Sequence, residues 1–247
     1  MNFTHLHVHS HYSVLDRMAK IPDLIAKCQR TGMTAMALTD HGCMYGIKEF
    51  LDTAKKINGK PKGKVKDCQE AIKKAEDKIK DLPKWEALLA AGHMQMSVLV
   101  DGQLVERDIE LTAHDRKDFQ SKIADAKRAQ KELPLLLEQL PQLEAQAAAY
   151  VPFKPIVGVE AYCARRHRKL KEKDLKITNG EGKEQVVDSS GWHLILLAKN
   201  KTGYFNLCKM VSLSYIEGFY HRPRIDKELL AMYHEGVICS SACLGGE

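Results

Sequence analysis

Short apolar strands alternate with amphipathic helices at the start of the sequence, and this alternation constrains the fold more than any other feature. Residues 3–9 alternate polar and apolar side chains, which is typical of a strand, and residues 34–39 form a second, more apolar strand. The spacing of apolar residues predicts helices over 21–30 and 45–57. Strand, helix, strand and helix in this order favour an α/β fold.

The same pattern resumes near residue 155. Strands are predicted over 155–162, 192–198 and 236–240, and helices over 202–216 and 226–233. Asp226 is the expected N-cap of the last helix. The polar, glycine-containing stretch 165–190 is expected to be a long loop.

Residues 58–152 differ in composition and are predicted to form an inserted, mainly helical lobe. Turn residues at 58–63 predict a break, and apolar residues at spacings of three and four then predict helices on both sides of a short hairpin at Asp101-Gly102. Pro134 and Pro141 predict that the second helical stretch is kinked or divided in two. The many charges of the lobe are interpreted as a solvated helix surface.

Composition excludes several classes of protein. The 247 residues contain no apolar stretch long enough to cross a membrane and no recognisable signal peptide. The seven cysteines have irregular spacings, which argues against a secreted disulfide framework and favours a reducing cytoplasm. We therefore expect a cytoplasmic protein with no membrane partner. The net charge of +6 is compatible with nucleic acid but does not establish it.

Side chains that bind metals occur on three of the predicted strands or directly after them. His7 and His9 share one face of the first strand, His41 follows the second, and Glu160 lies near the end of the third. Because sites in parallel α/β folds lie at the carboxyl ends of strands, we expect these residues to meet at one mouth. Imidazoles with a carboxylate suit Zn²⁺, Mn²⁺ or Fe²⁺. A His-x-His pair alone also fits an ordinary polar strand face.

Several motifs taken together resemble one known family. They are His7–Asp16, Leu38–Gly46, Val157–Tyr162, Trp192–Asn200, Gly203–Cys208, Glu217–Tyr220, Arg222–Asp226 and Ser241–Gly246. In this order they resemble the polymerase-and-histidinol-phosphatase (PHP) domain, in the version found at the N-terminus of bacterial DNA polymerase III alpha subunits. The resemblance covers 1–57 and 153–247 and leaves 58–152 out as an insertion.

The resemblance implies a distorted (βα)7 TIM-like barrel, here C-terminally truncated, with two or three divalent metals (Zn, Mn or Fe) at its mouth. The metal ligands that it implies are His7, His9, Asp16, His41, Glu160, His193 and Cys243, with Glu160 bridging two metals. The family's last ligand pair, Asp-x-His, has no counterpart in the sequence, so we expect an incomplete site. His193 opens its strand, which in a simple barrel places it at the wrong end, and Arg17 stands where the family usually has glycine.

The activity that the resemblance implies is metal-dependent phosphoester hydrolysis, with Glu160, His41 and His9 as catalytic residues. Within a replicative polymerase this activity would be 3′–5′ exonuclease proofreading, and the fragment itself is expected to be weakly active or inactive. One alternative is a metal-stabilised structural platform without catalysis, and another is a free-standing phosphatase of the histidinol phosphatase type.

The expected partners are a DNA primer-template, the remainder of the polymerase alpha chain and other replisome subunits. Arg165, Arg166 and Arg168 are candidate contacts to DNA phosphates, because a run of basic residues attracts the phosphate backbone. A solvated loop explains the same run equally well.

Overall fold

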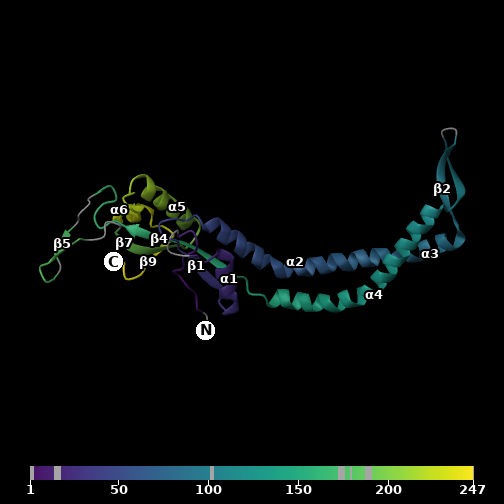
Figure 1. Cartoon of the computed structure of the whole chain (residues 1–247), viewed down its shortest axis with the longest axis horizontal. Helices are drawn as coiled ribbons and strands as arrows, with labels where there is room; N and C mark the ends of the chain where they lie inside the picture. Colours follow the sequence, from purple (N-terminus) through teal and green to yellow (C-terminus); the bar gives the residue numbers. More distant parts are fainter. Residues whose placement is uncertain are drawn as a thin grey trace. The chain divides into compact units, whose positions relative to one another are not determined.

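The structure, a computed structural model, describes residues 3–13, 18–100, 103–171, 176–178, 180–186 and 191–246 (Figure 1). It divides into two compact units, which are Met1–Asn58 together with Val151–Glu247, and Gly59–Tyr150. We call the first the sheet unit and the second the lobe. None of the helices in the described ranges is long and apolar enough to span a membrane.

One mixed β-sheet forms the centre of the sheet unit. Its strands in spatial order are β1 (Ala35–Leu38), β4 (Lys154–Cys163), β7 (Trp192–Ala198) and β9 (Val237–Ser241), with β8 (Arg224–Ile225) also paired with β4. β1 and β8 run parallel to β4, whereas β7 is antiparallel to both β4 and β9. The fold class is therefore mixed α/β. The antiparallel direction of β7 differs from a simple parallel sheet, and the pairings of the described residues do not close the sheet, so the distorted barrel stays a prediction.

The N-terminal segment lies along β1 but does not form the regular strand predicted over 3–9. His5 makes an isolated parallel bridge with Met36. The backbone N–H groups of Ala37 and Thr39 donate to the carbonyls of His5 and Val8, both at 2.8 Å. The segment thus runs parallel to β1, and this direction takes its histidines towards the carboxyl end of that strand.

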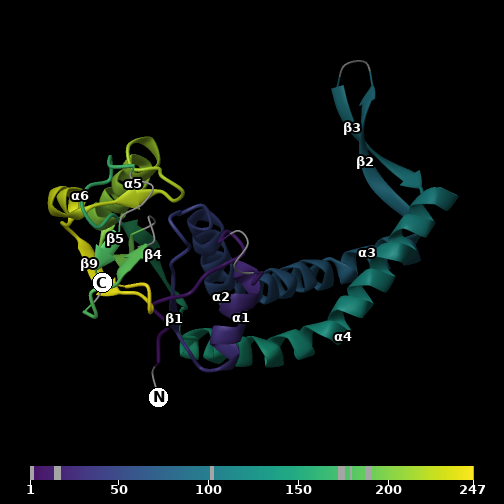
Figure 2. The ribbon, with the colours of Figure 1, turned by 60° about the vertical axis from the view of Figure 1, so that its left-hand side comes forward.

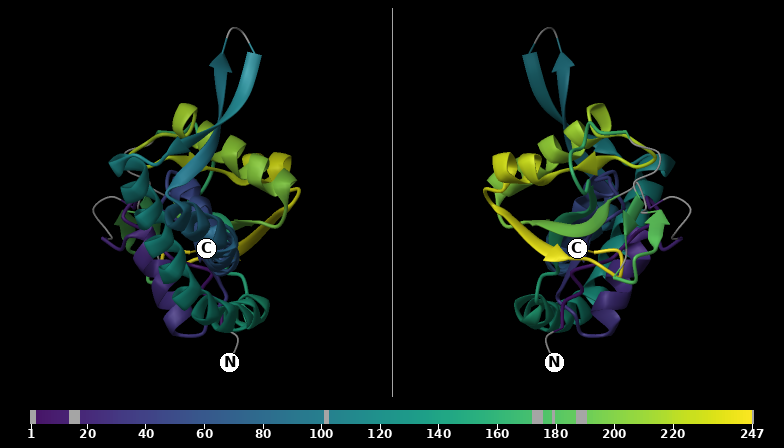
Figure 3. Two further views of the ribbon diagram at one scale, coloured as in Figure 1. Left: turned by 90° about the vertical axis from the view of Figure 1, so that its right-hand side faces the viewer. Right: turned by 90° about the vertical axis from the view of Figure 1, so that its left-hand side faces the viewer.

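Three helices of the sheet unit were predicted to within one residue. They are α1 (Ile21–Arg30), α5 (Lys201–Ile216) and α6 (Lys227–Tyr233). Asn200 and Asp226 cap α5 and α6 by accepting backbone N–H groups three residues later. α5 and α6 cover one face of the sheet, where Leu207 and Leu229 join a buried cluster with Leu196 (Figure 3). A small hairpin, β5 (Lys176–Thr178) with β6 (Glu184–Val186), lies in the stretch predicted to be a loop.

The lobe consists of long helices and one hairpin. Its elements are α2 (Ile47–Lys80, which begins in the sheet unit), α3 (Leu82–Ala91), β2 (His93–Val100), β3 (Gln103–Glu110) and α4 (Ala113–Ala149). Within the lobe α2 lies beside α4, where the thiol of Cys68 donates to the carbonyl of Leu136 at 3.6 Å (Figure 1). The hairpin β2–β3 projects away from the helices, and most side chains of β3 are exposed (Figure 2).

The predicted break at 58–63 is wrong, because α2 continues through it with Pro61 inside the helix. α4 is one helix with Pro134 and Pro141 inside it, so the prediction of two separate helices is wrong, and that of a kinked helix stays a prediction. A proline inside a helix costs about 3 kcal/mol, because it removes a hydrogen bond and crowds the preceding turn. Burial of apolar side chains such as Ile72 and Ala126 offsets this cost. Helical propensity alone does not include that tertiary contribution.

Candidate metal centre

Glu160 lies at the centre of the candidate site, on the second half of β4. Its side chain is only 1% exposed. His41, three residues beyond the end of β1, continues the parallel pairing and bridges Glu160, whose carbonyl accepts the N–H of Gly42 at 2.8 Å. A buried carboxylate requires partners, because burial without hydrogen bonds or charge compensation is costly. Four imidazoles provide these partners.

The two oxygens of the Glu160 carboxylate contact different imidazoles. Oε2 lies 2.9 Å from Nε2 of His7, 2.9 Å from Nε2 of His9 and 3.1 Å from Nδ1 of His41. Oε1 lies 2.7 Å from Nδ1 of His193. Two overlapping ligand groups result, His7–His9–Glu160 and His41–Glu160–His193, and each has its ligand atoms close enough to hold an ion.

His193 reaches the site because β7 is antiparallel to β4. His193 lies at the start of its strand, and in a simple parallel barrel the starts of the strands are at the end opposite the expected site. In the antiparallel pair the start of β7 lies beside the end of β4, with His193 opposite Tyr162. The implied role of His193 as a ligand is thus compatible with its geometry. The reason is the antiparallel direction of β7, which the sequence pattern of the strand does not indicate.

The arrangement of donor atoms fits divalent cations. Nε2 of His7 and Nε2 of His9 lie 2.9 Å apart, and each also lies 2.9 Å from the same oxygen of Glu160. Each neutral imidazole has a single N–H, so this triangle cannot be satisfied fully by hydrogen bonds. A cation accepts the lone pairs of both nitrogens and the charge of the carboxylate. Imidazole and carboxylate together are the ligands expected for Zn²⁺, Mn²⁺ or Fe²⁺.

Electrostatics keep Glu160 ionised. Burial by itself raises the pKa of this carboxyl, but hydrogen bonds from His9 and His7 and the neighbouring His41 outweigh it and lower the pKa to about 2. Glu160 therefore presents a full negative charge at neutral pH, and that charge is what a bridging ligand needs.

A buried polar network behind the ligands was not identified from the sequence. The carboxylate of Asp40 accepts the N–H and hydroxyl of Ser10 at 2.6 and 2.8 Å and the hydroxyl of Ser13 at 2.8 Å. The hydroxyl of Ser13 accepts the backbone N–H of His41 at 3.1 Å and lies 3.5 Å from Nδ1 of His9. The network fixes the orientation of two candidate ligands. The sequence feature that could have indicated this network is Asp40, directly before His41.

Ring packing further fixes the imidazoles. His9 and His41 stack with centroids 4.1 Å apart, and the ring of Tyr162 meets His193 edge-on at 4.9 Å. Gly42 has φ +60°, and a Cβ at this position would lie 3.2 Å from the Tyr162 ring. Glycine is therefore required in the turn that places His41.

Cys243 lies at the edge of the cluster. Its Sγ is 3.6 Å from Nδ1 of His193 and 4.0 Å from Oε1 of Glu160, and it accepts the N–H of Gly245 at 3.4 Å. Cys243 is thus not part of either ligand group found around Glu160 in the described residues. Asp16 and Arg17 lie outside the described residues.

Arg168 is buried among carboxylates, which argues against its expected contact with DNA phosphates. The residue is only 6% exposed. Its guanidinium donates to Asp226 at 2.9 Å, to Glu228 at 2.6 Å and to Glu217 at 2.7 Å. His167 lies 3.3 Å from Glu228, and His167, Asp226 and Glu228 form a third group of metal-ligand type. Since Arg168 already supplies the positive charge there, we assign no ion to this group.

The other two arginines of the basic run differ from Arg168. The guanidinium carbon of Arg165 lies 3.7 Å from the centroid of the Trp192 ring, and Arg166 is exposed. An arginine stacked on an aromatic ring is fixed in place. Their expected contact with DNA remains a prediction.

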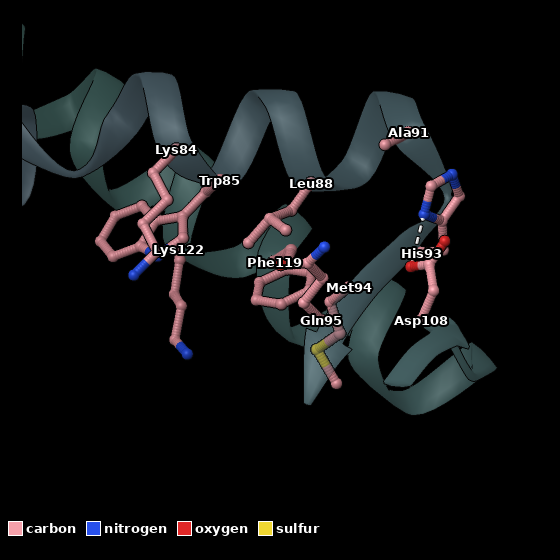
Figure 4. Close-up of a pocket in the computed structure, with 10 residues that line it drawn as sticks. All are labelled: Lys84, Trp85, Leu88, Ala91, His93, Met94, Gln95, Asp108, Phe119 and Lys122. Carbon is pink, nitrogen blue, oxygen red and sulfur yellow. Dashed lines mark hydrogen bonds and ion pairs between the residues drawn. The ribbon is translucent and has the colours of Figure 1, made fainter. Parts of the chain in front are cut away.

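The lobe contains a separate cavity of about 660 Å³ (Figure 4). It is lined by Lys84, Trp85, Leu88, Ala91, His93, Met94, Gln95, Asp108, Phe119 and Lys122. His93 and Asp108 form an exposed pair at 2.8 Å on neighbouring strands of the hairpin. A single imidazole and a single carboxylate do not make a metal site comparable to that around Glu160.

Comparison with known proteins identifies the family. The model of the PHP domain matches residues 5–80 and 86–247. This range is wider than the motifs predicted, because it includes most of 58–152.

DNA polymerase III subunit alpha of Borreliella burgdorferi is 32% identical over 244 residues, which are 99% of this chain and 12% of that protein. The subunits of the same name from Chlamydia pneumoniae and Treponema pallidum are 30% and 28% identical, over 99% and 100% of this chain. The chain spans 11 to 12% of the length of these three relatives. It belongs to the PHP domain family.

Proposed function

We propose that the sheet unit binds at least two divalent metals and hydrolyses phosphoesters. The observation that carries this proposal is that the buried Glu160 carboxylate belongs to two groups of ligand type, with three imidazoles at Oε2 and a fourth at Oε1. A carboxylate in this position is suited to bridge two ions. When bound, such ions supply an activated water and stabilise the negative charge that develops on phosphate oxygens.

The residues of the chain have distinct roles in this proposal. His7, His9 and Glu160 hold one ion, and His41, Glu160 and His193 hold the other. Asp16 and Cys243 are proposed as further ligands. Ser13, which touches both His9 and the backbone of His41, positions the two imidazoles, since misplacement by about 1 Å can cost on the order of 100-fold in rate.

The polymerase relatives favour DNA as the substrate. We propose that the longer protein is a replicative polymerase alpha chain, and that this site removes nucleotides from a DNA 3′ end, as a proofreading 3′–5′ exonuclease. A primer-template, the rest of the alpha chain and other replisome subunits are the proposed partners. We also expect the mixed sheet to belong to a distorted (βα)7 barrel. A free-standing phosphatase of small phosphomonoesters is less well supported, because the relatives named above are polymerase subunits.

The experiment that tests this function measures bound metal and hydrolysis together. The purified chain is titrated with Mn²⁺ and Zn²⁺, and its activity is measured on a primer-template with a mismatched 3′ end. His9→Ala should lower both metal content and hydrolysis, whereas His93→Ala, an exposed histidine of the lobe, should change neither. The same assay on a form extended through an Asp-x-His strand tests whether that ligand pair is needed for full activity.

One result would favour the structural alternative. If both lengths bind metal but neither hydrolyses DNA, and if His9→Ala merely lowers the melting temperature, then the metal stabilises a platform. If no form of the protein binds metal, the proposal is wrong.

A further inference from the structure

We infer that the lysine-rich part of α2 in the lobe, Lys60 to Lys66, binds the phosphate backbone of nucleic acid. This surface lies outside the basic run that the sequence indicated. The inference does not depend on the proposed hydrolysis, because binding can be measured without any metal.

The charged side chains of this segment are all of one sign. Lys60, Lys62, Lys64 and Lys66 fall within seven residues, and no acidic residue occurs from Thr53 to Lys66. All four lysines are exposed. The lobe as a whole contains sixteen basic and sixteen acidic residues between 59 and 150, so its charges are balanced but separated along the chain.

The lysines repel one another along the helix. Lys60 and Lys64 are four residues apart, as are Lys62 and Lys66, and like charges at this spacing destabilise a helix. Gly59, Pro61 and Gly63 in the same stretch are poor helix formers. Lys66 forms an ion pair with Glu70 at 3.6 Å. An external polyanion would remove the repulsion and stabilise the helical form of this segment.

The side chains fit a phosphate backbone better than an acidic protein. The apolar residues between the lysines, Pro61 and Val65, are half-buried. The segment therefore offers no exposed apolar centre for a protein interface. Lysine is depleted at protein interfaces but common at phosphates, where it acts as a point charge without demanding bidentate geometry. Lys60 and Lys64 are about 6 Å apart along the helix axis, which lets each neutralise a different phosphate. We therefore expect binding without sequence preference.

The test measures the salt dependence of DNA binding by the full chain. Fluorescein-labelled single-stranded and duplex DNA of one sequence are titrated with protein at several salt concentrations in the presence of EDTA. The triple variant Lys60→Gln, Lys62→Gln and Lys64→Gln should bind duplex on the order of ten- to a hundredfold more weakly at low salt. The slope of log K against log salt should fall by about 2 to 3, since each phosphate contact contributes about 0.9.

A matched control lies on the same helix. Lys73→Gln, Lys74→Gln and Lys78→Gln remove three exposed lysines that lie among Glu70, Glu76 and Asp77, and the salt slope should stay nearly unchanged. Replacing Lys60, Lys62 and Lys64 by arginine should preserve both affinity and slope. Circular dichroism of each variant shows whether α2 is retained, and single Lys→Gln variants, each expected to lower the slope by about 0.9, replace the triple variant if it unfolds.

Three outcomes would overturn the inference. Equal slopes for wild type and the 60–62–64 variant would show that these lysines do not meet phosphates. An equal loss in the 73–74–78 control would show a diffuse charge effect. Binding to polyglutamate but not to DNA would assign the segment to an acidic protein partner.

Discussion

The sheet unit and the lobe bury different kinds of side chain. Every described polar or charged side chain that is buried lies in the sheet unit, including Ser10, Asp40, Glu160, Arg168 and Asp226. The buried side chains described in the lobe are all apolar, and they lie on the helices or next to a helix end. Buried polar groups are costly unless each one has a partner. Because the described buried polar side chains all lie in the sheet unit, this unit is where we expect a functional site.

The comparison also separates two kinds of electrostatics. In the sheet unit, opposite charges and imidazoles meet at hydrogen-bond distances around Glu160 and Arg168. In the lobe, lysines lie exposed on the outside of a helix and contribute little to the fold. Substitutions in the sheet unit should consequently affect activity and stability, and those in the lobe should affect binding.

The largest effect should come from Glu160→Gln. The substitution keeps the shape of the side chain but removes the charge shared by the two ligand groups, so metal affinity and hydrolysis should fall on the order of 100-fold or more. Metal content by elemental analysis and hydrolysis of the mismatched primer measure this loss. Glu106→Gln on the exposed hairpin is the control and should be neutral. Normal metal binding by Glu160→Gln would remove the basis of the bridged site.

The next effect concerns folding alone. Arg168→Ala leaves the carboxylate of Asp226 buried without its ion pair and should lower the free energy of unfolding by about 3 to 5 kcal/mol. Arg166→Ala removes an exposed neighbour and should change it by no more than about 0.5 kcal/mol. Urea unfolding of both variants tests the difference. Equal stabilities would mean that the Arg168 cluster does not support the fold.

A smaller effect appears as pH falls. Burial by itself raises the pKa of Asp226, but hydrogen bonds from the backbone N–H groups of Arg168 and Leu229 and from the Arg168 guanidinium outweigh it, so the pKa lies below its ordinary value of 3.8. Its stabilising contribution is present above that value and is lost as pH falls through the lowered pKa. Unfolding midpoints of wild type and Asp226→Asn should therefore converge in acid. A difference independent of pH would contradict this assignment.

The smallest effect should follow removal of the lobe. Asn58 and Phe153 lie near the two points where the chain passes between the sheet unit and the lobe, and they are hydrogen-bonded to each other. The Asn58 side chain donates to the Phe153 carbonyl at 2.9 Å and accepts the backbone N–H of Phe153 at 2.8 Å. Deleting 60–150 and joining the ends with a Gly/Ser linker should leave a cooperatively folding sheet unit. Its stability should change by no more than about 1 kcal/mol, because closure entropy depends weakly on loop length.

Two measurements sharpen that prediction. Calorimetry of the deletion form should show one transition, and adding Asn58→Ala should lower its midpoint. An insoluble or non-cooperative product would show that the lobe is needed for the sheet unit to fold.

Local sequence patterns were sufficient for much of the sheet unit. The spacing of apolar residues gave α1, α5 and α6 nearly residue by residue, and the His-x-His pair, His41 and Glu160 were selected because of their positions on or directly after predicted strands. These features depend on the periodicity of side chains along one element, which the sequence contains directly. The same reasoning missed Asp40 and its serines, since a buried hydrogen-bond network has no period.

Tertiary structure decided the rest. His193 reaches Glu160 only because β7 pairs antiparallel with β4, and the direction of a strand depends on its neighbours in the sheet. Pro61, Pro134 and Pro141 remain inside helices because packing between distant segments offsets their local cost. Arg168 belonged to a basic run in the sequence, yet carboxylates from 217, 226 and 228 enclose it. Each of these outcomes depends on contacts between residues far apart in the chain, and local pattern carries no information about such contacts.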